Sequence, residues 1–350
     1  ALDANTTGTA ASAFGKDALG AHTTGDKNSA FGSNAAAATT TGVKNSAFGA
    51  FALAYNTTGG NNTALGRSAL NVATTASNNT AVGDGSLGAN TTASNNTAVG
   101  KSALAANTTG AENTALGYNA LDANTTANNN VAIGAYAASA NTTGVSNTVV
   151  GYAALGANTT GNYNVAIGQD ALNDNTTAGS NTAVGFRAAR DNTTGSSNTA
   201  IGYFALISNT TGIYNVAVGS GALDANTTAN NNTAVGTNSL GACTTGTENT
   251  ALGSYALNVS TTAGYNTAVG YAAMKDCTTG SINVAIGREA MQNITTGAKN
   301  VAIGRSALDT LTTGEENVAI GDLALNNSTS SSLVAVGAEA LKQNTDGTGN

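Results

Sequence analysis

The chain has 350 residues and a formal charge of −7, with 9% charged and 5% aromatic residues, 44 Gly, and no Pro or Trp. Its 41% apolar content separates it from charge-rich disordered segments, and the lack of basic clusters excludes a nucleic-acid partner. No apolar run reaches the ~18–20 residues of a membrane span, so we expect no membrane contact within this segment.

One unit of 17 residues repeats along the sequence. The Gly that ends the pentapeptide NTAVG falls at Gly15 and then at every 17th residue as far as Gly321, and a shortened unit near residues 322–337 ends at Gly337. Such a period is typical of solenoids and fits no helical repeat. We therefore predict an all-β parallel β-solenoid of about twenty coils, roughly 95 Å long at ~4.8 Å per coil. The array is predicted to be single and continuous over residues 1–350, and to be a segment of a longer chain because it opens in the second half of a unit.

Each unit starts with Asn, followed by a run such as TAV, the invariant Gly, a second apolar run that usually ends in Leu, and a turn that usually contains Asn-Thr-Thr. We predict two short strands and two turns per unit. Stacked Asn side chains can hydrogen-bond between coils, and the invariant Gly indicates a positive φ or a close backbone approach. Charges are tolerated just after this Gly and just before the opening Asn, so both places should be exposed. This structural ladder is represented by Asn79, Asn96, Asn113, Gly83, Gly100 and Gly117.

The Asn-Thr-Thr turn permits three interpretations. NTT is an N-glycosylation sequon, which would give a glycan-coated filament, while the alternative is a turn Asn with local hydrogen bonds. Replacement of this Asn in several units suggests an exposed or half-exposed site. The regular Thr files also suggest an ice-binding solenoid, although only one Thr per coil can reach a given face. The candidate glycosylation sites are Asn5, Asn56, Asn90, Asn107, Asn124, Asn141, Asn158, Asn175, Asn192, Asn209 and Asn226.

No constellation for catalysis, a cofactor or a metal is present in the sequence, so we expect no enzyme. His22 has no accompanying Cys or carboxylate cluster and is interpreted as a tolerated turn substitution. Cys243 and Cys277 lie two units apart, about 10 Å, which exceeds the roughly 7 Å limit for a disulfide, so free thiols are expected. If the solenoid binds carbohydrate, the predicted contacts are the aromatic residues after the invariant Gly, namely Tyr118, Tyr152, Phe186, Tyr203 and Tyr271.

The TAV run places a large apolar residue on one face and Ala on the other, with no charge on either. A strand covered on both faces has this pattern. Burial of the few apolar residues of one coil offsets only a small part of the free energy lost when the backbone of that coil becomes ordered. We therefore predict a homotrimer in which other copies cover the second face, with end-to-end filaments as a further form of self-association.

The pentapeptides NVAIG (starting at 130, 164, 283, 300 and 317), NTAVG, and NSAFG (starting at 28 and 45) resemble the head repeats of trimeric autotransporter adhesins, the YadA-like group. The NTTG-bearing arrays also resemble repeats of phage tail fibres and other surface fibres. The resemblance implies a left-handed β-roll, a homotrimer, and an extracellular, cell-surface or virion location. The expected function is a stiff fibre or adhesin segment that spaces or presents a surface-binding region, with host surface, matrix or carbohydrate as possible partners. The alternatives are an ice- or carbohydrate-binding module, or the glycan-coated filament.

Overall fold

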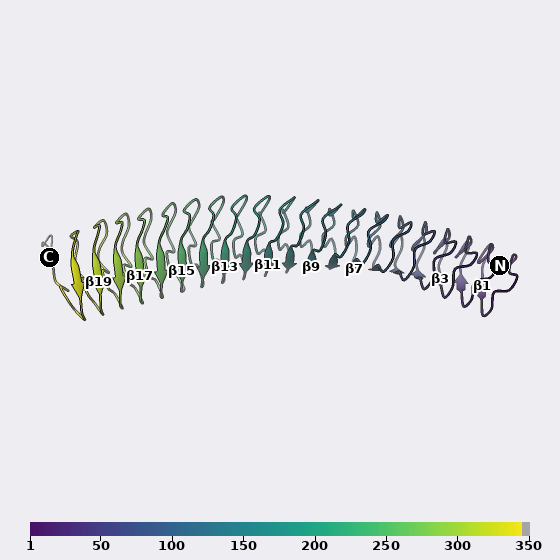
Figure 1. The fold of residues 1–350 in the computed structure, drawn as a ribbon, viewed down its shortest axis with the longest axis horizontal. Helices are drawn as coiled ribbons and strands as arrows, with labels where there is room; N and C mark the ends of the chain where they lie inside the picture. Colours follow the sequence, from purple (N-terminus) through teal and green to yellow (C-terminus); the bar gives the residue numbers. More distant parts are fainter. Residues whose placement is uncertain (345–350) are drawn as a thin grey trace. The chain divides into compact units, whose positions relative to one another are not determined.

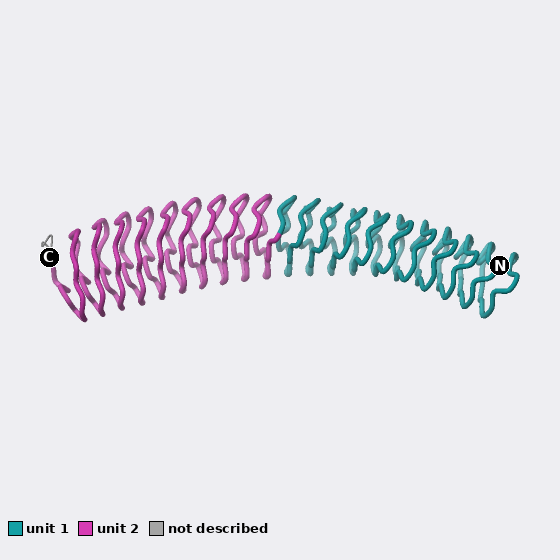
Figure 2. The backbone as a smooth tube through the Cα atoms, viewed as in Figure 1, with its two compact units in different colours: residues 1–179 teal, residues 180–350 magenta. Residues whose placement is uncertain are grey.

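The computed structural model describes residues 1–344, which fall into two compact units, residues 1–179 and residue 180 onward (Figure 2). Over this range the regular secondary structure consists of twenty strands of three residues each, without a helix. Figure 1 shows that each coil contributes one strand, and that the strands of a unit lie in a row along one side of its coils.

The first unit contains β1 (Ser12–Phe14), β2 (Ser29–Phe31), β3 (Ser46–Phe48), β4 (Thr63–Leu65), β5 (Thr80–Val82), β6 (Thr97–Val99), β7 (Thr114–Leu116), β8 (Val131–Ile133), β9 (Thr148–Val150) and β10 (Val165–Ile167). The second unit contains β11 (Thr182–Val184), β12 (Thr199–Ile201), β13 (Val216–Val218), β14 (Thr233–Val235), β15 (Thr250–Leu252), β16 (Thr267–Val269), β17 (Val284–Ile286), β18 (Val301–Ile303), β19 (Val318–Ile320) and β20 (Val334–Val336).

Neighbouring strands within each unit pair in parallel, with equivalent residues of successive coils opposite one another. β7 pairs with β8 through Ala115 and Ala132. β19 pairs with β20 through Val318 and Val334, so the shortened unit keeps the register of its strand and absorbs the missing residue in its loop. The predicted parallel β-solenoid is confirmed. The left-handed sense, the trimer and the continuity of the array between the two units stay predictions.

From β2 onward, each strand directs its central residue inward and the residues on either side of it outward. The central residue is buried in every strand from β2 to β20, and it is Ala except in β9. In β8, Ala132 is fully buried, whereas Ile133 is 37% exposed. The alternation of side chains across a strand therefore places the Ala face in the core and leaves the large apolar face uncovered within one chain.

The predicted second strand is a turn, and that prediction is wrong. We use the name Leu turn for the seven residues that start with the invariant Gly, such as Gly117–Ala123 after β7. Ala120 and Leu121 are adjacent and both fully buried, which a strand cannot achieve because its side chains alternate. Leu121 has φ 51°, so left-handed backbone turns both side chains into the core.

The invariant Gly satisfies both conditions proposed for it. Gly83, Gly100 and Gly117 have φ of 135°, 135° and 142°. A Cβ atom on Gly100 would lie 2.3 Å from the carbonyl oxygen of Gly117 in the next coil. Any side chain here would therefore combine an unfavourable backbone conformation with a backbone collision.

The opening Asn ties each coil to its neighbour. The backbone N–H of Asn96 donates to Oδ1 of Asn79 (3.0 Å), and the N–H of Asn113 donates to Oδ1 of Asn96 (2.9 Å). The Nδ2 group of Asn96 donates to the carbonyl of Gly110 (2.9 Å). These side chains are fully buried. The predicted Asn ladder is confirmed, although its main link runs from backbone to side chain rather than between amides.

Candidate functional site

The Asn of the Asn-Thr-Thr turn forms a second ladder inside the coil. Nδ2 of Asn107 donates to Oδ1 of Asn90 (3.0 Å), and Nδ2 of Asn124 donates to Oδ1 of Asn107 (2.9 Å). The same Nδ2 of Asn107 also donates to the carbonyl of Gly110, 2.8 Å away, which closes the turn. The second unit repeats this arrangement from Asn192 to Asn226, with bonds of 2.6 and 2.7 Å through the intervening Asn.

The expectation that this Asn is exposed is wrong, because the turn directs it into the core. Of the predicted glycosylation sites only Asn5, in the first coil, is exposed. A glycan would have to be attached to a buried Nδ2 that already donates a hydrogen bond inside the coil, as in Asn56, Asn90 and Asn107. The residues that replace this Asn in other coils are buried too: Thr39, Ala73, Ser260, Ile294 and Leu311. The predicted sites that are fully buried are Asn56, Asn90, Asn107, Asn124, Asn141, Asn158, Asn175, Asn192, Asn209 and Asn226. A glycan-coated filament is therefore not proposed.

The two Thr residues of the turn have different surroundings. The hydroxyl of the first Thr donates to the carbonyl of its equivalent in the next coil, as from Thr108 to Thr125 (3.0 Å). The second Thr is exposed in every coil of the described range, as at Thr109 and Thr126. One exposed file lacks the second row that a two-dimensional ice-binding array needs, so we do not propose ice binding.

The residue before the invariant Gly forms an exposed or half-exposed apolar file, here called the aliphatic file. Leu116 is 45% exposed and Ile133 is 37% exposed. No charged residue occupies this place in any coil, nor the outward place two residues earlier. An uncharged surface that exposes large apolar side chains is a candidate protein contact. In the first unit the file is Phe14, Phe31, Phe48, Leu65, Val82, Val99, Leu116, Ile133, Val150 and Ile167; in the second it is Val184, Ile201, Val218, Val235, Leu252, Val269, Ile286, Ile303, Ile320 and Val336.

The aromatic residues predicted as carbohydrate contacts gather on the Leu turns. In the first unit Tyr136 lies between Tyr118 and Tyr152, with ring centroids 5.2 and 6.0 Å away and rings nearly perpendicular. Burial and a hydrogen bond with Tyr118 raise the pKa of Tyr136. Sequence reasoning missed Tyr136, because it is the second residue after its Gly and meets the rings of both neighbouring coils.

The second unit has two further aromatic groups on its Leu turns. Phe186 stacks on Tyr203 (5.6 Å), and Tyr203 contacts Phe204 (4.0 Å). Tyr271 lies 6.1 Å from Tyr255, which sequence reasoning also missed. In each group the missed residue occupies the second place after the invariant Gly, next to a predicted residue.

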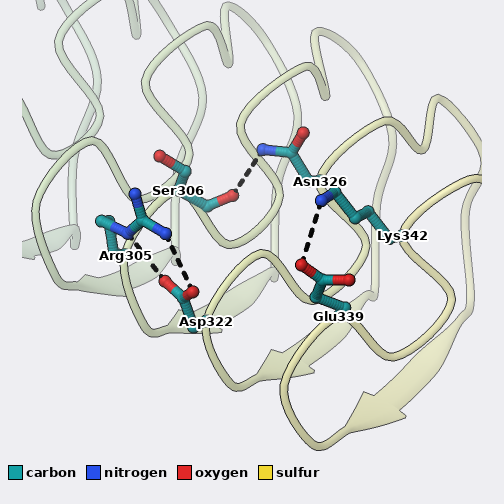
Figure 3. A network of polar contacts seen from close by, with 6 residues as sticks. All are labelled: Arg305, Ser306, Asp322, Asn326, Glu339 and Lys342. Carbon is teal, nitrogen blue, oxygen red and sulfur yellow. Dashed lines mark hydrogen bonds and ion pairs between the residues drawn. The ribbon is translucent and has the colours of Figure 1, made fainter.

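Charged residues pair between adjacent coils at the places predicted to be exposed. Near the end of the second unit, Arg305 forms two bonds to Asp322, 2.8 and 2.9 Å long (Figure 3). This pairing lowers the pKa of Asp322 below its usual value. In the same view Lys342 lies 3.2 Å from Glu339. Exposed ion pairs of this kind contribute little to stability. They show which side of the coil faces the solvent, and they are not a candidate site.

The residue after the buried Leu shows where carboxylates are disfavoured. At three of the coils where it is Asn, its amide donates to a carbonyl of the preceding coil, as Asn326 does to Ser306 (2.9 Å, Figure 3). Asp122, Asp224 and Asp309 occupy the same place, and burial raises the pKa of each. A carboxylate cannot donate to that carbonyl, so these three coils lose the bond while the carboxyl is ionised.

The two Cys and the single His belong to the inner ladder. Cys243 and Cys277 are buried free thiols, as expected, and burial raises the pKa of each to about 11. His22 is fully buried, with Nδ1 3.1 Å from Oδ1 of Asn5 and Nε2 3.2 Å from Nδ2 of Asn28. All three side chains replace the turn Asn, and each occupies its place in the core.

Within residues 1–344 no three His, Cys, Asp or Glu side chains come together as a metal site would require. That range also holds no helix with the length and apolarity to cross a membrane. Comparison with models of protein families gives no match, and comparison with curated proteins gives none either.

Proposed function

We propose that the chain is a structural rod that assembles with other copies of itself, as a homotrimer, and serves outside the cell or on a virion as a spacer or adhesin segment. The aliphatic file carries this proposal. Its side chains are apolar in every coil, they point away from the core, and every other regularly exposed place in the coil accepts charged or polar residues.

The amount of exposed apolar surface is consistent with a stable contact between copies. Phe31 and Phe48 are 39% and 38% exposed, which for side chains of roughly 200 Å² amounts to about 80 Å² each. The smaller aliphatic residues contribute less, so the ten coils of one unit present roughly 500–700 Å². A standard interface buries about 800 Å² per partner, and the flanking Ser, Thr and Val residues add to the area.

Regular stacking supports a mechanical role. A coil is held by the backbone ladder and by the ladder of the opening Asn, which both recur along each unit. Most coils add a buried Leu, and the coils that have a turn Asn add the inner ladder. A protein that repeats the same interactions from coil to coil forms an extended surface rather than a single concave active site. The resemblance to adhesin heads and phage fibres supports the surface location.

The test is the mass of the native particle by light scattering. We expect three chains of 33.9 kDa, about 102 kDa in all. The double variant Ile133→Asp, Ile167→Asp should reduce the particle toward one chain, because charges on the aliphatic file lose their water in the contact. The control places the same charges on the Leu turns of the same two coils, Ala135→Asp and Gln169→Asp, where Asp84 and Asp322 occur naturally. A monomeric wild type, or equal effects of the two double variants, would contradict the proposal.

A further inference from the structure

The Leu turns of the second unit form a hollow of about 260 Å³ beside Tyr255 and Tyr271. It exists because Ala272 is small. Ala272 is the second residue after its Gly, and in the flanking coils that place is filled by Tyr255 and Glu289. The two phenol rings stand at 80° to each other, and Tyr271 is 51% exposed, so its ring is available to a ligand.

The polar groups around the hollow provide both donors and acceptors. Lys275 supplies an ammonium group, Glu289 a carboxylate, and Gln292 an amide that can both donate and accept. Glu289 pairs with the adjacent Arg288 (2.9 Å), and its charge also acts on the nearby carboxyl of Asp309. The lining itself carries one cation, Lys275, and one carboxylate, Glu289, which favours a neutral ligand over a charged one.

We propose that this hollow binds a neutral sugar ring of an oligosaccharide. A sugar has apolar C–H faces that can lie against a phenol ring, and a rim of hydroxyls that both donate and accept hydrogen bonds. Small-ligand sites combine aromatic walls with a few well-placed polar groups, and the lining here has both.

The first unit has another, less polar hollow on its Leu turns. Its volume is about 340 Å³, and it is lined by Asn34, Ala37, Ala38, Phe51, Ala54 and Tyr55. The Tyr136 cluster lies on the Leu turns of the same unit. Because equivalent turns of successive coils lie about 4.8 Å apart, a chain of sugar rings could extend over several coils of one unit.

This inference rests on the proposed function in one respect: it names the class of ligand that an adhesin segment would bind. Oligomeric state and sugar binding are measured separately, so one can fail without the other. If the protein is a monomer and binds sugar, only the proposed trimer is contradicted. If it is a trimer and binds no sugar, only the sugar-binding inference is contradicted.

The experiment is saturation-transfer NMR, followed by titration, with three neutral probes: maltohexaose, cellohexaose and chitohexaose. We expect at least one to bind with Kd in the range of about 1 mM or tighter. Tyr271→Ala should weaken binding to the second unit about tenfold or more, as expected when an aromatic contact is removed. The matched control is Tyr265→Ala, which removes a tyrosine that is 59% exposed and lies outside the hollow, just before an opening Asn.

A second variant guards against a folding effect. Ala272→Tyr fills the hollow with the residue that Tyr255 provides one coil away, at a place where φ is 55° for Ala272 and 60° for Tyr255. It should keep the fold, as judged by circular dichroism, and weaken binding as Tyr271→Ala does. Lack of binding by all three probes, or equal losses in the Tyr265→Ala and Tyr271→Ala variants, would overturn the inference. Unchanged binding in the folded Ala272→Tyr variant would also overturn it.

Discussion

Replacement of one invariant glycine tests how a coil is built. Gly134 has φ 134°, and a Cβ atom on it would lie 2.5 Å from the carbonyl oxygen of Gly151 in the next coil. The backbone conformation costs an L-residue about 1–3 kcal/mol, and forced overpacking costs a similar amount. The oxygen cannot withdraw without disturbing the coil that carries it. We therefore expect Gly134→Ala to lower the free energy of unfolding by about 3–5 kcal/mol.

The matched control is Gly144→Ala in the same coil. A Cβ atom on Gly144 would also lie close to a backbone oxygen, 2.4 Å from that of Gly161, but Gly144 does not have a positive φ. Alanine occupies this place in six other coils, at Ala76, Ala93, Ala127, Ala178, Ala229 and Ala263. The backbone there can therefore adjust, and we expect a change within about 1 kcal/mol.

The assay is urea unfolding followed by far-ultraviolet circular dichroism, with hydrogen exchange of the coil around β8 to detect local opening in a repeat protein. If the two variants lose the same free energy of unfolding, the close contact of the added Cβ atom accounts for both losses. The positive φ of Gly134 then adds no measurable cost, which contradicts the prediction.

Three further predictions follow from buried polar groups. Asn147→Leu should cost about 2–4 kcal/mol in urea unfolding, because it leaves the backbone N–H of Asn164 and a carbonyl without the partners that Asn147 now provides; a loss below the error of the measurement would contradict this. Asp224→Asn should add about 1 kcal/mol at pH 7, because the new amide can donate to the carbonyl of Phe204 as equivalent Asn residues do. The pKa of Asp224 is higher in the native state than in the unfolded state, so the native state binds more protons at pH values between the two pKa values. The contribution of Asp224 to the free energy of unfolding should therefore increase as the pH falls through that window. The Asp224→Asn variant should lack this pH dependence, and a variant whose stability varies with pH as the wild type does would refute the prediction. The two cysteines should resist a thiol reagent at pH 8 in the native state and both react in urea, since burial raises the pKa of each to about 11; rapid native reaction would show that the coil opens there.

Much of the fold was predictable because the repeat shows which residue types each place accepts. The period, the stacking register and the positive φ of the invariant Gly follow from residues that never vary. The Leu turn was harder to predict, because Ala120 and Leu121 look like part of a strand until the left-handed backbone at Leu121 is known. That conformation is unusual for Leu. It is accompanied here by burial of the side chain and by a hydrogen bond from the Leu121 N–H to the carbonyl of Ala137 in the next coil.

The candidate sites were less predictable because exposure was inferred from variation. Replacement of the turn Asn by Thr, Ala, Ser, Ile or Leu suggests an exposed or half-exposed place when only the sequence is considered, yet each substitute is buried. The core accepts such changes even in successive coils. The turn Asn is absent from a run of them, at Cys243, Ser260, Cys277, Ile294, Leu311 and Ser328. The aromatic groups were found in part, since Tyr118 and Tyr152 were named, while the ring between them comes from a place that only the stacked geometry brings close.

The Asn ladder has a consequence for how such a gene can change. An opening Asn such as Asn96 accepts from the next coil the same bond that it donates to the coil before it. A whole coil gained by recombination therefore meets complementary groups on both of its sides. The number of coils can then change while the contacts between coils stay the same. Selection can therefore adjust the length of the array in steps of one coil. A frame-preserving loss inside a unit is tolerated where the loop can shorten, as between Ser328 and Leu333, where the strand register survives.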